Sequence, residues 1–315
     1  MIYTVTLNPA LDREYSVPIF TFNSVLRSPN AQVDWGGKGF NVSRMVHALG
    51  GESVALGFAG GKTGEQLRDG LESLGIETRF IWVDGETRTN TSIVGGLDKT
   101  GGQGYIKVNE PGPTVSAEKQ AEILAQVQEL AKAGDWWVLA GSLPPGADAD
   151  IYAKMIAIVQ AAGGRAILDS SGEALAAGCA AAPFLAKPND VEVGALTGLP
   201  VSTAKDVLAA AQAVRASGVT HVVISLGKKG AMLVSEEGVW QARPPRIQER
   251  NPIGAGDSMV GGLVYGLSRG DDLATALTWG LACGSATASL DGTTLGSRAQ
   301  VEALLEEVEI RRLGD

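Results

Sequence analysis

The chain alternates, over most of its length, between short apolar runs and amphipathic helical periods. Apolar, β-branched runs recur at "YTVTL", "VALGFAG", "WWVLAG", "RAILDS", "FLAKPN" and "HVVISLG". Between them, apolar residues recur at helical spacing, as at Val42, Met45, Val46 and Leu49. Near-continuous apolar strands separated by helices are typical of a parallel sheet that is covered by helices on both faces. The pattern therefore predicts an α/β fold. Because no Pro/Gly/Ser-rich linker and no fixed repeat interrupts it, we expect a single domain over residues 1–315.

Two stretches, 9–36 and 87–108, carry strand-like patterns without an intervening helix. Turn-forming residues from Asp98 to Gly104 divide the second stretch into an expected hairpin. Segments that leave a sheet and return to it can form a small β-sheet lid, here from about 10–36 and 87–108. An ordinary surface hairpin explains the pattern equally well. A lid has unpaired edges, so pairing with a second copy of the chain is one natural way to cover them. A homodimer through the lid is therefore one expectation.

The composition narrows the classes of function. The chain has 315 residues, of which 44% are hydrophobic, and no run approaches the roughly 18 apolar residues that a membrane span needs. The formal net charge of −9 argues against nucleic acid as a partner, because phosphate backbones are bound by basic surfaces. Two distant cysteines, and an N-terminus without signal-peptide features, favour a reducing cytoplasm. Two histidines and no cysteine cluster argue against a transition-metal site. We expect a cytoplasmic protein that binds neither nucleic acid nor a membrane.

The stretch "NPIGAGDSMVGG", residues 251–262, places glycines at the start of an amphipathic helical period. A helix N-terminus has unpaired backbone N–H groups and a partial positive charge, and small residues let an anion approach them. The amides of Gly254, Ala255 and Gly256 would form an anion hole. Asp257 beside it would accept the proton of an attacking hydroxyl in phosphoryl transfer. Taken alone, however, these four residues favour a plain helix cap, because Asp and Gly are both common near helix N-termini.

The stretch "WGGKGFNVSRMVHALG", residues 35–50, also places glycines before a helical period. Gly36, Gly37 and Gly39 precede a helical period, and Lys38 and Asn41 lie on its first turn. Bare amides, an ammonium and a carboxamide at one helix N-terminus suit a polyhydroxylated or phosphorylated ligand. A flexible turn with a solvated lysine is the plainer alternative. Two such helix N-termini in one α/β chain favour the ligand-binding interpretation more than one does. Dinucleotide binding is less well supported, because no G-x-G-x-x-G motif follows the first strand.

Four segments in order along the chain resemble the ribokinase-like (PfkB) carbohydrate kinases. They are "GGKGFNVSR", "LAKPNDVE" at 185–192, "VVISLGKKGA" at 222–231 and "GAGDSMVGG" at 254–262. "LNPALD", "KVNEPGP" and "GSLPPG" resemble the branch of this family that acts on hexose phosphates. The resemblance implies a ribokinase-like fold, in which a central, mostly parallel sheet is flanked by helices on both faces and carries a small β-sheet lid.

The resemblance also implies roles for individual residues on the sugar side. Asp257 would be the catalytic base beside the anion hole, and Asp12 would bind sugar hydroxyls with Gly36, Gly37 and Asn41. The phosphate already on the sugar would be held by Arg88 with Arg27, Lys38, Asn90 and Lys107. Arginine suits this task because its planar fork binds phosphate through two hydrogen bonds. Each residue taken singly also fits a plainer role, Asp12 as a turn residue and each cation as a solvated surface group.

On the nucleotide side, the resemblance implies that ATP and Mg²⁺ are bound. Asn189 and Glu192 match the family's N-x-x-E element, which positions Mg²⁺ and the ATP phosphates through water. Because Mg²⁺ commonly keeps several waters, few direct ligands are needed. Lys187, Ser225, Gly227 and Gly230 match nucleotide-contacting positions. A capping box at Asn189 and Glu192, and a simple turn at the two glycines, are the alternatives. The segment "TASLDGTT", 287–294, aligns with a region that in relatives can bind a monovalent cation.

The expected function is an ATP- and Mg²⁺-dependent kinase that phosphorylates the free primary hydroxyl of a ketohexose phosphate. Fructose 1-phosphate, giving fructose 1,6-bisphosphate, is the preferred substrate. Tagatose 6-phosphate and fructose 6-phosphate are the alternatives within the hexose-phosphate branch. A kinase for unphosphorylated sugars or nucleosides, a non-catalytic sugar-phosphate sensor and, more distantly, a nicotinamide-dependent reductase remain as rival functions.

Overall fold

The computed structural model of the chain describes residues 1–97, 103–292 and 294–314. Its main sheet has the strand order β14-β13-β12-β11-β10-β9-β8-β1-β4-β5. In this order, the neighbouring strands from β11 through β1 to β5 are all parallel. At the other end of the sheet, β12, β13 and β14 pair antiparallel. The bounds are β1 Ile2–Thr6, β4 Val54–Ala59, β5 Glu77–Trp82, β8 Trp136–Ala140, β9 Arg165–Asp169, β10 Leu185–Ala186, β11 His221–Ser225, β12 Ala231–Val234, β13 Val239–Arg243 and β14 Glu309–Leu313. The predicted α/β fold with a mostly parallel sheet is confirmed.

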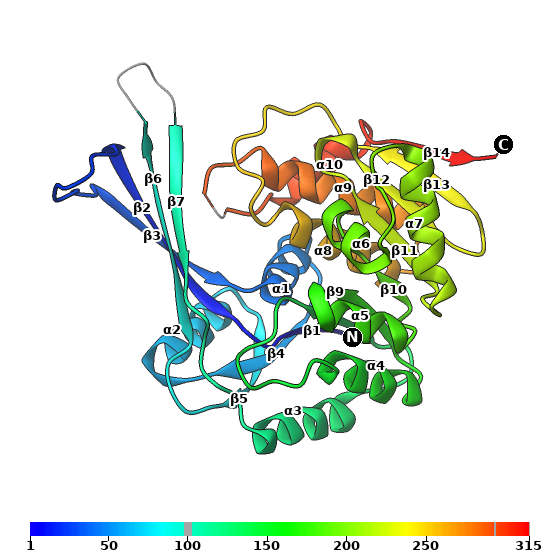
Figure 1. Cartoon of the computed structure of the whole chain (residues 1–315), viewed down its shortest axis with the longest axis horizontal. Helices are drawn as coiled ribbons and strands as arrows, with labels where there is room; N and C mark the ends of the chain where they lie inside the picture. Colours follow the sequence, from blue (N-terminus) through cyan, green and yellow to red (C-terminus); the bar gives the residue numbers. More distant parts are fainter. Residues whose placement is uncertain (98–102, 293, 315) are drawn as a thin grey trace.

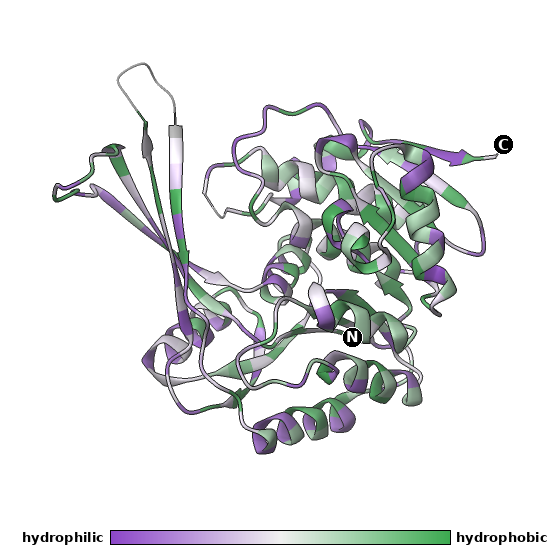
Figure 2. Cartoon of the chain, in the orientation of Figure 1, coloured by the Kyte–Doolittle hydropathy of each residue, from purple (hydrophilic) through white to green (hydrophobic). Residues whose placement is uncertain are grey.

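Helices cover both faces of this sheet, because successive strand side chains point to opposite sides. In β8, Trp137 and Leu139 join the core under α3 to α7, while Trp136 and Val138 join the core under α1, α8 and α9. Hydrophobic residues accordingly gather on the central strands (Figure 2). The helices are α1 Lys38–Ala48, α2 Gly61–Ser73, α3 Ala117–Leu130, α4 Ile151–Ala161, α5 Gly172–Ala180, α6 Asp190–Thr197, α7 Ala204–Ala216, α8 Ala255–Ser268, α9 Leu273–Ala288 and α10 Arg298–Leu305. None of the helices in the described ranges is long and apolar enough to cross a membrane.

A second, smaller sheet projects from the main body (Figure 1). Its order is β3-β2-β6-β7, with β2 Ala10–Ile19, β3 Asn30–Gly36, β6 Arg88–Gly96 and β7 Gln103–Asn109. Both stretches that lacked a predicted helix therefore contribute to it. The expected hairpin is present as the antiparallel pair β6 and β7, although the turn at 98–102 lies outside the described residues. Strand β2 pairs with β3 antiparallel and with β6 parallel, which places Asp12 opposite Asp34 and Asn90.

Candidate active site

The expected site residues gather at the carboxyl ends of the parallel strands. Asp169 ends β9, Lys187 follows β10 directly and Ser225 ends β11. The N-termini of α1 and α8 open at the same edge, and their side chains meet there, because Asn41 of α1 contacts Asp257 of α8. Ligands of open α/β sheets bind at this edge. The topology thus brings together segments that lie far apart in the sequence.

The N-terminus of α8 presents unpaired backbone donors. Gly254 is the N-cap residue with φ of +79°, and no side chain caps the helix within the described ranges. The Ala255 amide donates to the Pro252 carbonyl at 3.2 Å. For the amides of Gly254, Gly256 and Asp257, the described part of the chain supplies no acceptor. Three amides here are therefore available to an anion, and they include that of Asp257 but not that of Ala255, which was expected to contribute.

The Asp257 carboxylate faces α1 rather than capping its own helix. Asn41 Nδ2 donates to Asp257 Oδ2 at 2.8 Å. Burial, and next the negative charge of Asp169, raise the pKa of Asp257 to about 6, although Lys38, the Asn41 hydrogen bond and Lys187 act in the opposite direction. A carboxylate with a pKa near 6 is closer to the pH at which it must accept a proton than an ordinary aspartate.

A buried carboxylate that the sequence reasoning missed lies beside Asp257. Asp169 is 1% exposed, with Oδ1 3.1 Å from Lys38 Nζ and Oδ2 3.4 Å from Lys187 Nζ. The pKa of Lys38 is raised by the charges of Asp169, Asp257 and Glu192, against the effect of burial. Lys38 therefore pairs with Asp169 in this structure. The only local signal for Asp169 was its place at the end of the apolar run "RAILD".

Asp12 and its neighbours form a second polar group at the start of the small sheet. Asn90 Nδ2 donates to Asp12 Oδ1 at 2.8 Å, and burial raises the pKa of Asp12. A Cβ atom on Gly36 would lie 2.2 Å from Asp12 Oδ2, so only glycine leaves room for this carboxylate. Gly37 adopts φ of +128° as the N-cap residue of α1. Asp12, Gly36, Gly37 and Asn90 are thus brought together.

The three other cations that were expected to bind the sugar's phosphate lie in different environments. Lys107 is exposed on β7, and its charge acts on Asp12. Arg88 donates to the carbonyls of Asn8 at 2.9 Å, Glu110 at 3.2 Å and Pro9 at 3.3 Å, so its guanidinium holds the backbone around the site. Arg27 is exposed in the segment between β2 and β3, beyond the Ser16–Asn30 pair and at the opposite end of β2 from Asp12. The structure therefore does not bring Arg27 to this group within one chain.

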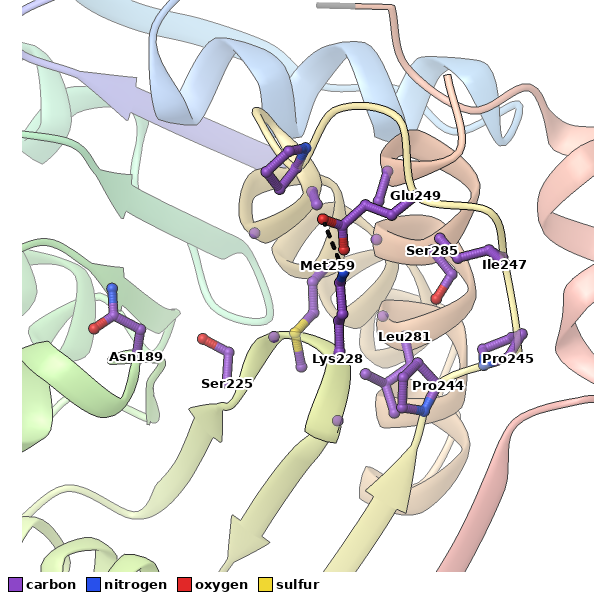
Figure 3. Close-up of a pocket in the computed structure, with 18 of the residues that line it drawn as sticks. Asn189, Ser225, Lys228, Pro244, Pro245, Ile247, Glu249, Met259, Leu281 and Ser285 are labelled. Carbon is purple, nitrogen blue, oxygen red and sulfur yellow. Dashed lines mark ion pairs between the residues drawn. The ribbon is translucent and has the colours of Figure 1, made fainter. Parts of the chain in front are cut away.

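A cavity of about 630 Å³ opens beside the α8 N-terminus (Figure 3). The expected residues Asn189, Ser225, Gly227 and Gly230 line it, together with Ala255 and Gly256. Gly230 has φ of +94°, and a Cβ there would lie 2.0 Å from the Ala242 carbonyl oxygen. Across the cavity Lys228 and Glu249 point toward one another with their charged groups 3.5 Å apart. Lys187 is not part of this lining, but its Nζ lies 3.9 Å from the Cβ position of Gly256.

The plainer alternative for Asn189 and Glu192 is present in the structure. The Glu192 amide donates to Asn189 Oδ1, and the Asn189 amide donates to Glu192 Oε2, both at 2.8 Å. This capping box starts α6 and stabilises its first turn. It leaves Glu192 Oε1 free for a further ligand. Within residues 1–97, 103–292 and 294–314, no group of three or more His, Cys, Asp or Glu side chains is placed to hold a metal directly.

The comparisons with known proteins agree with this geometry. A family model described as "pfkB family carbohydrate kinase" matches residues 6–300, and the chain belongs to this family of carbohydrate kinases. Over 313 residues, 99% of this chain and 100% of the relative, it is 39% identical to a 1-phosphofructokinase of Bacillus subtilis. It is 35% identical to the ATP-dependent 6-phosphofructokinase isozyme 2 of Escherichia coli over 96% of this chain and 97% of that protein. The crystal structure of phosphofructokinase-2 from Escherichia coli in complex with potassium superposes with a TM-score of 0.89 at 33% identity, covering 97% of this chain and 98% of that one.

Proposed function

We propose that this chain transfers the terminal phosphoryl group of ATP to the free primary hydroxyl of fructose 1-phosphate, giving fructose 1,6-bisphosphate. The observation that carries the proposal is the α8 N-terminus, where unpaired amides adjoin the Asp257 carboxylate. It adjoins the cavity lined by Ser225 and Gly227. On its other side, Asn41 contacts both Asp257 and Arg44, and Arg44 pairs with Asp34, which lies opposite Asp12 in the small sheet. A donor pocket and an acceptor pocket thus share one anion hole.

The proposed mechanism follows from these positions. The sugar binds through Asp12, Gly36, Gly37 and Asn41, so that its hydroxyl faces Asp257. Asp257 cannot remove the hydroxyl proton in advance, because even a pKa of about 6 is far below that of an alcohol. It accepts the proton as the new bond to phosphorus forms. The free amides of Gly254, Gly256 and Asp257 stabilise the negative charge on the migrating group, which is usually the largest contribution to such catalysis.

The donor set fits ATP with Mg²⁺ held through water. One carboxylate oxygen of Glu192 lies outside the capping box, and the charge of Glu192 helps to raise the pKa of Lys38 at the site. Bound Mg²⁺ would neutralise charge on the transferred phosphate. We also propose a monovalent-cation requirement, since a relative was crystallised in complex with potassium. The end of α9 is connected to the segment before α8, because the Ala288 carbonyl accepts the amides of Arg250 and Asn251.

Fructose 1-phosphate is proposed over its alternatives because the 1-phosphofructokinase of Bacillus subtilis shares 39% identity with this chain, against 35% for the 6-phosphofructokinase. An ADP-release assay with fructose 1-phosphate, fructose 6-phosphate, tagatose 6-phosphate and free fructose tests the proposal. We expect fructose 1-phosphate to give the highest kcat/KM. Equal or better use of free fructose would contradict a hexose-phosphate kinase. Sugar-phosphate binding without ADP release would favour the non-catalytic sensor.

The raised pKa of Asp257 gives a pH prediction. The base must be ionised to accept a proton, so turnover should fall as the pH drops through about 6. Because a sugar phosphate also titrates near pH 6, rates alone do not assign the group. Carbon-13 NMR of the aspartate carboxyls in the unliganded protein should show one group titrating near pH 6 that is missing from Asp257→Asn. A spectrum in which every aspartate titrates below pH 5 would contradict the assignment.

We further propose that the small sheet acts as a lid over the sugar and pairs with a second copy of the chain, both sheets working as one unit. Large hydrophobic side chains are exposed on this sheet and on its β2–β3 connection: Phe22, Val25, Val33, Tyr105, Ile106 and Val108. Of these, Val33, Ile106 and Val108 lie on one face of the sheet, whereas Tyr105 lies on the other. Pairing with an identical sheet would bury the shared face and cover the free strand edges. Sedimentation velocity should then give the mass of two chains, and a single-chain mass at micromolar concentration would contradict the pairing.

A further inference from the structure

Asp169 joins two ammonium groups that come from different parts of the chain. Lys38 is the first residue of α1, and Lys187 follows β10. One carboxylate contacts both, through Oδ1 at 3.1 Å and Oδ2 at 3.4 Å. Asp169 itself is 1% exposed and does not line the nucleotide cavity. It is therefore placed to act on a ligand only through its neighbours.

Both ammonium groups lie beside the proposed path of the phosphoryl group. Lys187 is 3% exposed, and its Nζ lies 3.9 Å from the Cβ position of Gly256, whose amide is free. The Lys38 side chain is 37% exposed, so its remaining N–H donors can reach a ligand. The charges of Asp257 and Glu192 both act on Lys38, which places it between the base and the nucleotide side. One lysine thus adjoins the anion hole, and the other adjoins the base.

We propose that Asp169 is a positioning residue that holds Lys38 and Lys187 as a two-ammonium clamp on the migrating phosphoryl group. This inference rests on the proposed kinase function and adds two cationic contacts to the amides of α8. Lysine has a long, flexible side chain, so it contributes to a transition state only when its position is fixed beforehand. A single carboxylate below both ammonium groups fixes them and offsets their mutual repulsion.

Removal of the Asp169 charge would disturb both lysines. Lys187 would become a buried cation without its counter-ion, which favours rotation away from the site. Lys38 would lose the contact that fixes its ammonium group. The groups that face Asp257 are Asp169 from β9, Lys38 and Asn41 from α1, and Lys187 after β10. Loss of the Asp169 charge lowers the pKa of Asp257 and departure of the two lysines raises it, so the net shift does not report on the clamp.

The test is Asp169→Asn, which keeps the shape of the side chain and removes its charge. We expect kcat to fall by about 100-fold, by analogy with the loss of one transition-state donor, with little change in the KM for the sugar phosphate. A lower kcat with the KM retained is the result that a merely structural role would not produce. Asp135→Asn is the matched control, because Asp135 is also buried and also pairs with an ammonium, that of Met1 at 3.1 Å, but lies before β8. It should leave turnover unchanged.

A variant cycle tests whether Asp169 acts through the lysines. In a protein that already carries Lys38→Met and Lys187→Met, Asp169→Asn should cost less than threefold in kcat. A full 100-fold loss in that background would overturn the clamp, as would a normal kcat in Asp169→Asn alone. If Asp169→Asn does not fold, Asp169→Glu replaces it, and the shifted carboxylate should lower kcat with little change in the KM for the sugar phosphate.

Two different measurements test the proposed function and the role of Asp169. Wild-type turnover with the four sugars decides the function. A crystal structure of Asp169→Asn decides the positions of the lysines without any turnover. We expect both Nζ atoms to leave the positions they hold around Asp169. Lysines that stay in place in the variant would contradict the positioning role even if the protein is a fructose 1-phosphate kinase.

Discussion

Replacement of Asp257 by asparagine is expected to lower kcat by about 10²–10⁴-fold, the contribution typical of a general base. The amide has nearly the shape of the carboxylate and can still accept the hydrogen bond from Asn41, so both substrates should bind with nearly unchanged affinity. It cannot accept the proton of the sugar hydroxyl. Steady-state ADP release, combined with calorimetric titration of ATP and sugar phosphate, measures the two effects separately.

Asp206 offers a matched control for this substitution. Asp206 occupies the third helical position of α7, the position that Asp257 occupies in α8, but it belongs to a capping box with Thr203. Asp206→Asn should leave kcat unchanged. Normal turnover in a folded Asp257→Asn protein would remove Asp257 as the base.

The melting temperature should respond differently to Asp257→Asn and to Asp206→Asn. Burial raises the pKa of Asp257 above its unfolded value, so the ionised carboxylate costs stability at pH above about 6, and its removal should not lower Tm at pH 8. Hydrogen bonds with Thr203 lower the pKa of Asp206, so that carboxylate stabilises the fold above its unfolded pKa, and its loss should lower Tm slightly.

Replacement of Asp12 by alanine is expected to lower kcat/KM for the sugar phosphate by roughly 10–200-fold, the cost of losing one or two hydrogen bonds to a charged group. The KM for ATP should hardly change, because Asp12 is not part of the nucleotide cavity. Gly36→Ala should have a similar effect, since its Cβ would lie 2.2 Å from Asp12 Oδ2 and displace that carboxylate.

The two substitutions should not be additive, because both act on one carboxylate. In a double-variant cycle, Gly36→Ala should add little once Asp12 is alanine. Gly194→Ala in α6 is the control for the added methyl group, as its Cβ would meet its nearest neighbour at 3.5 Å, an ordinary contact. Independent losses that multiply in the double variant would show that Gly36 acts through something other than Asp12.

The arrangement of elements was predictable where the signal is local. Fully apolar runs such as "WWVLAG" can be buried only in a strand that is covered on both faces, and β8 is such a strand. The small sheet followed from two stretches without helical periods. The capping box of Asn189 and Glu192 was weighed as an alternative, because its spacing alone specifies it.

The features that could not be predicted depend on chain topology. Asp169 pairs with a lysine that lies 131 residues away, and no local pattern marks that contact. Lys38 was expected near the sugar's phosphate, but its direction was set by this carboxylate. Arg88 was expected to hold the sugar's phosphate, and its contacts with three backbone carbonyls, which come from separate segments, could not be read from the sequence. The position of Arg27 depends on where the connection between β2 and β3 ends, which strand periodicity does not specify.

The central claim is that the α8 N-terminus binds the migrating phosphoryl group while Asp257 receives the proton of the sugar. A crystal structure with ADP, fructose 1-phosphate, Mg²⁺ and aluminium fluoride, which imitates the transferring group, tests it most directly. The account predicts the fluoride at hydrogen-bond distance from the amides of Gly254, Gly256 and Asp257, with the sugar's free primary hydroxyl against the Asp257 carboxylate. A fluoride bound elsewhere, or a hydroxyl that faces away from Asp257, would contradict it.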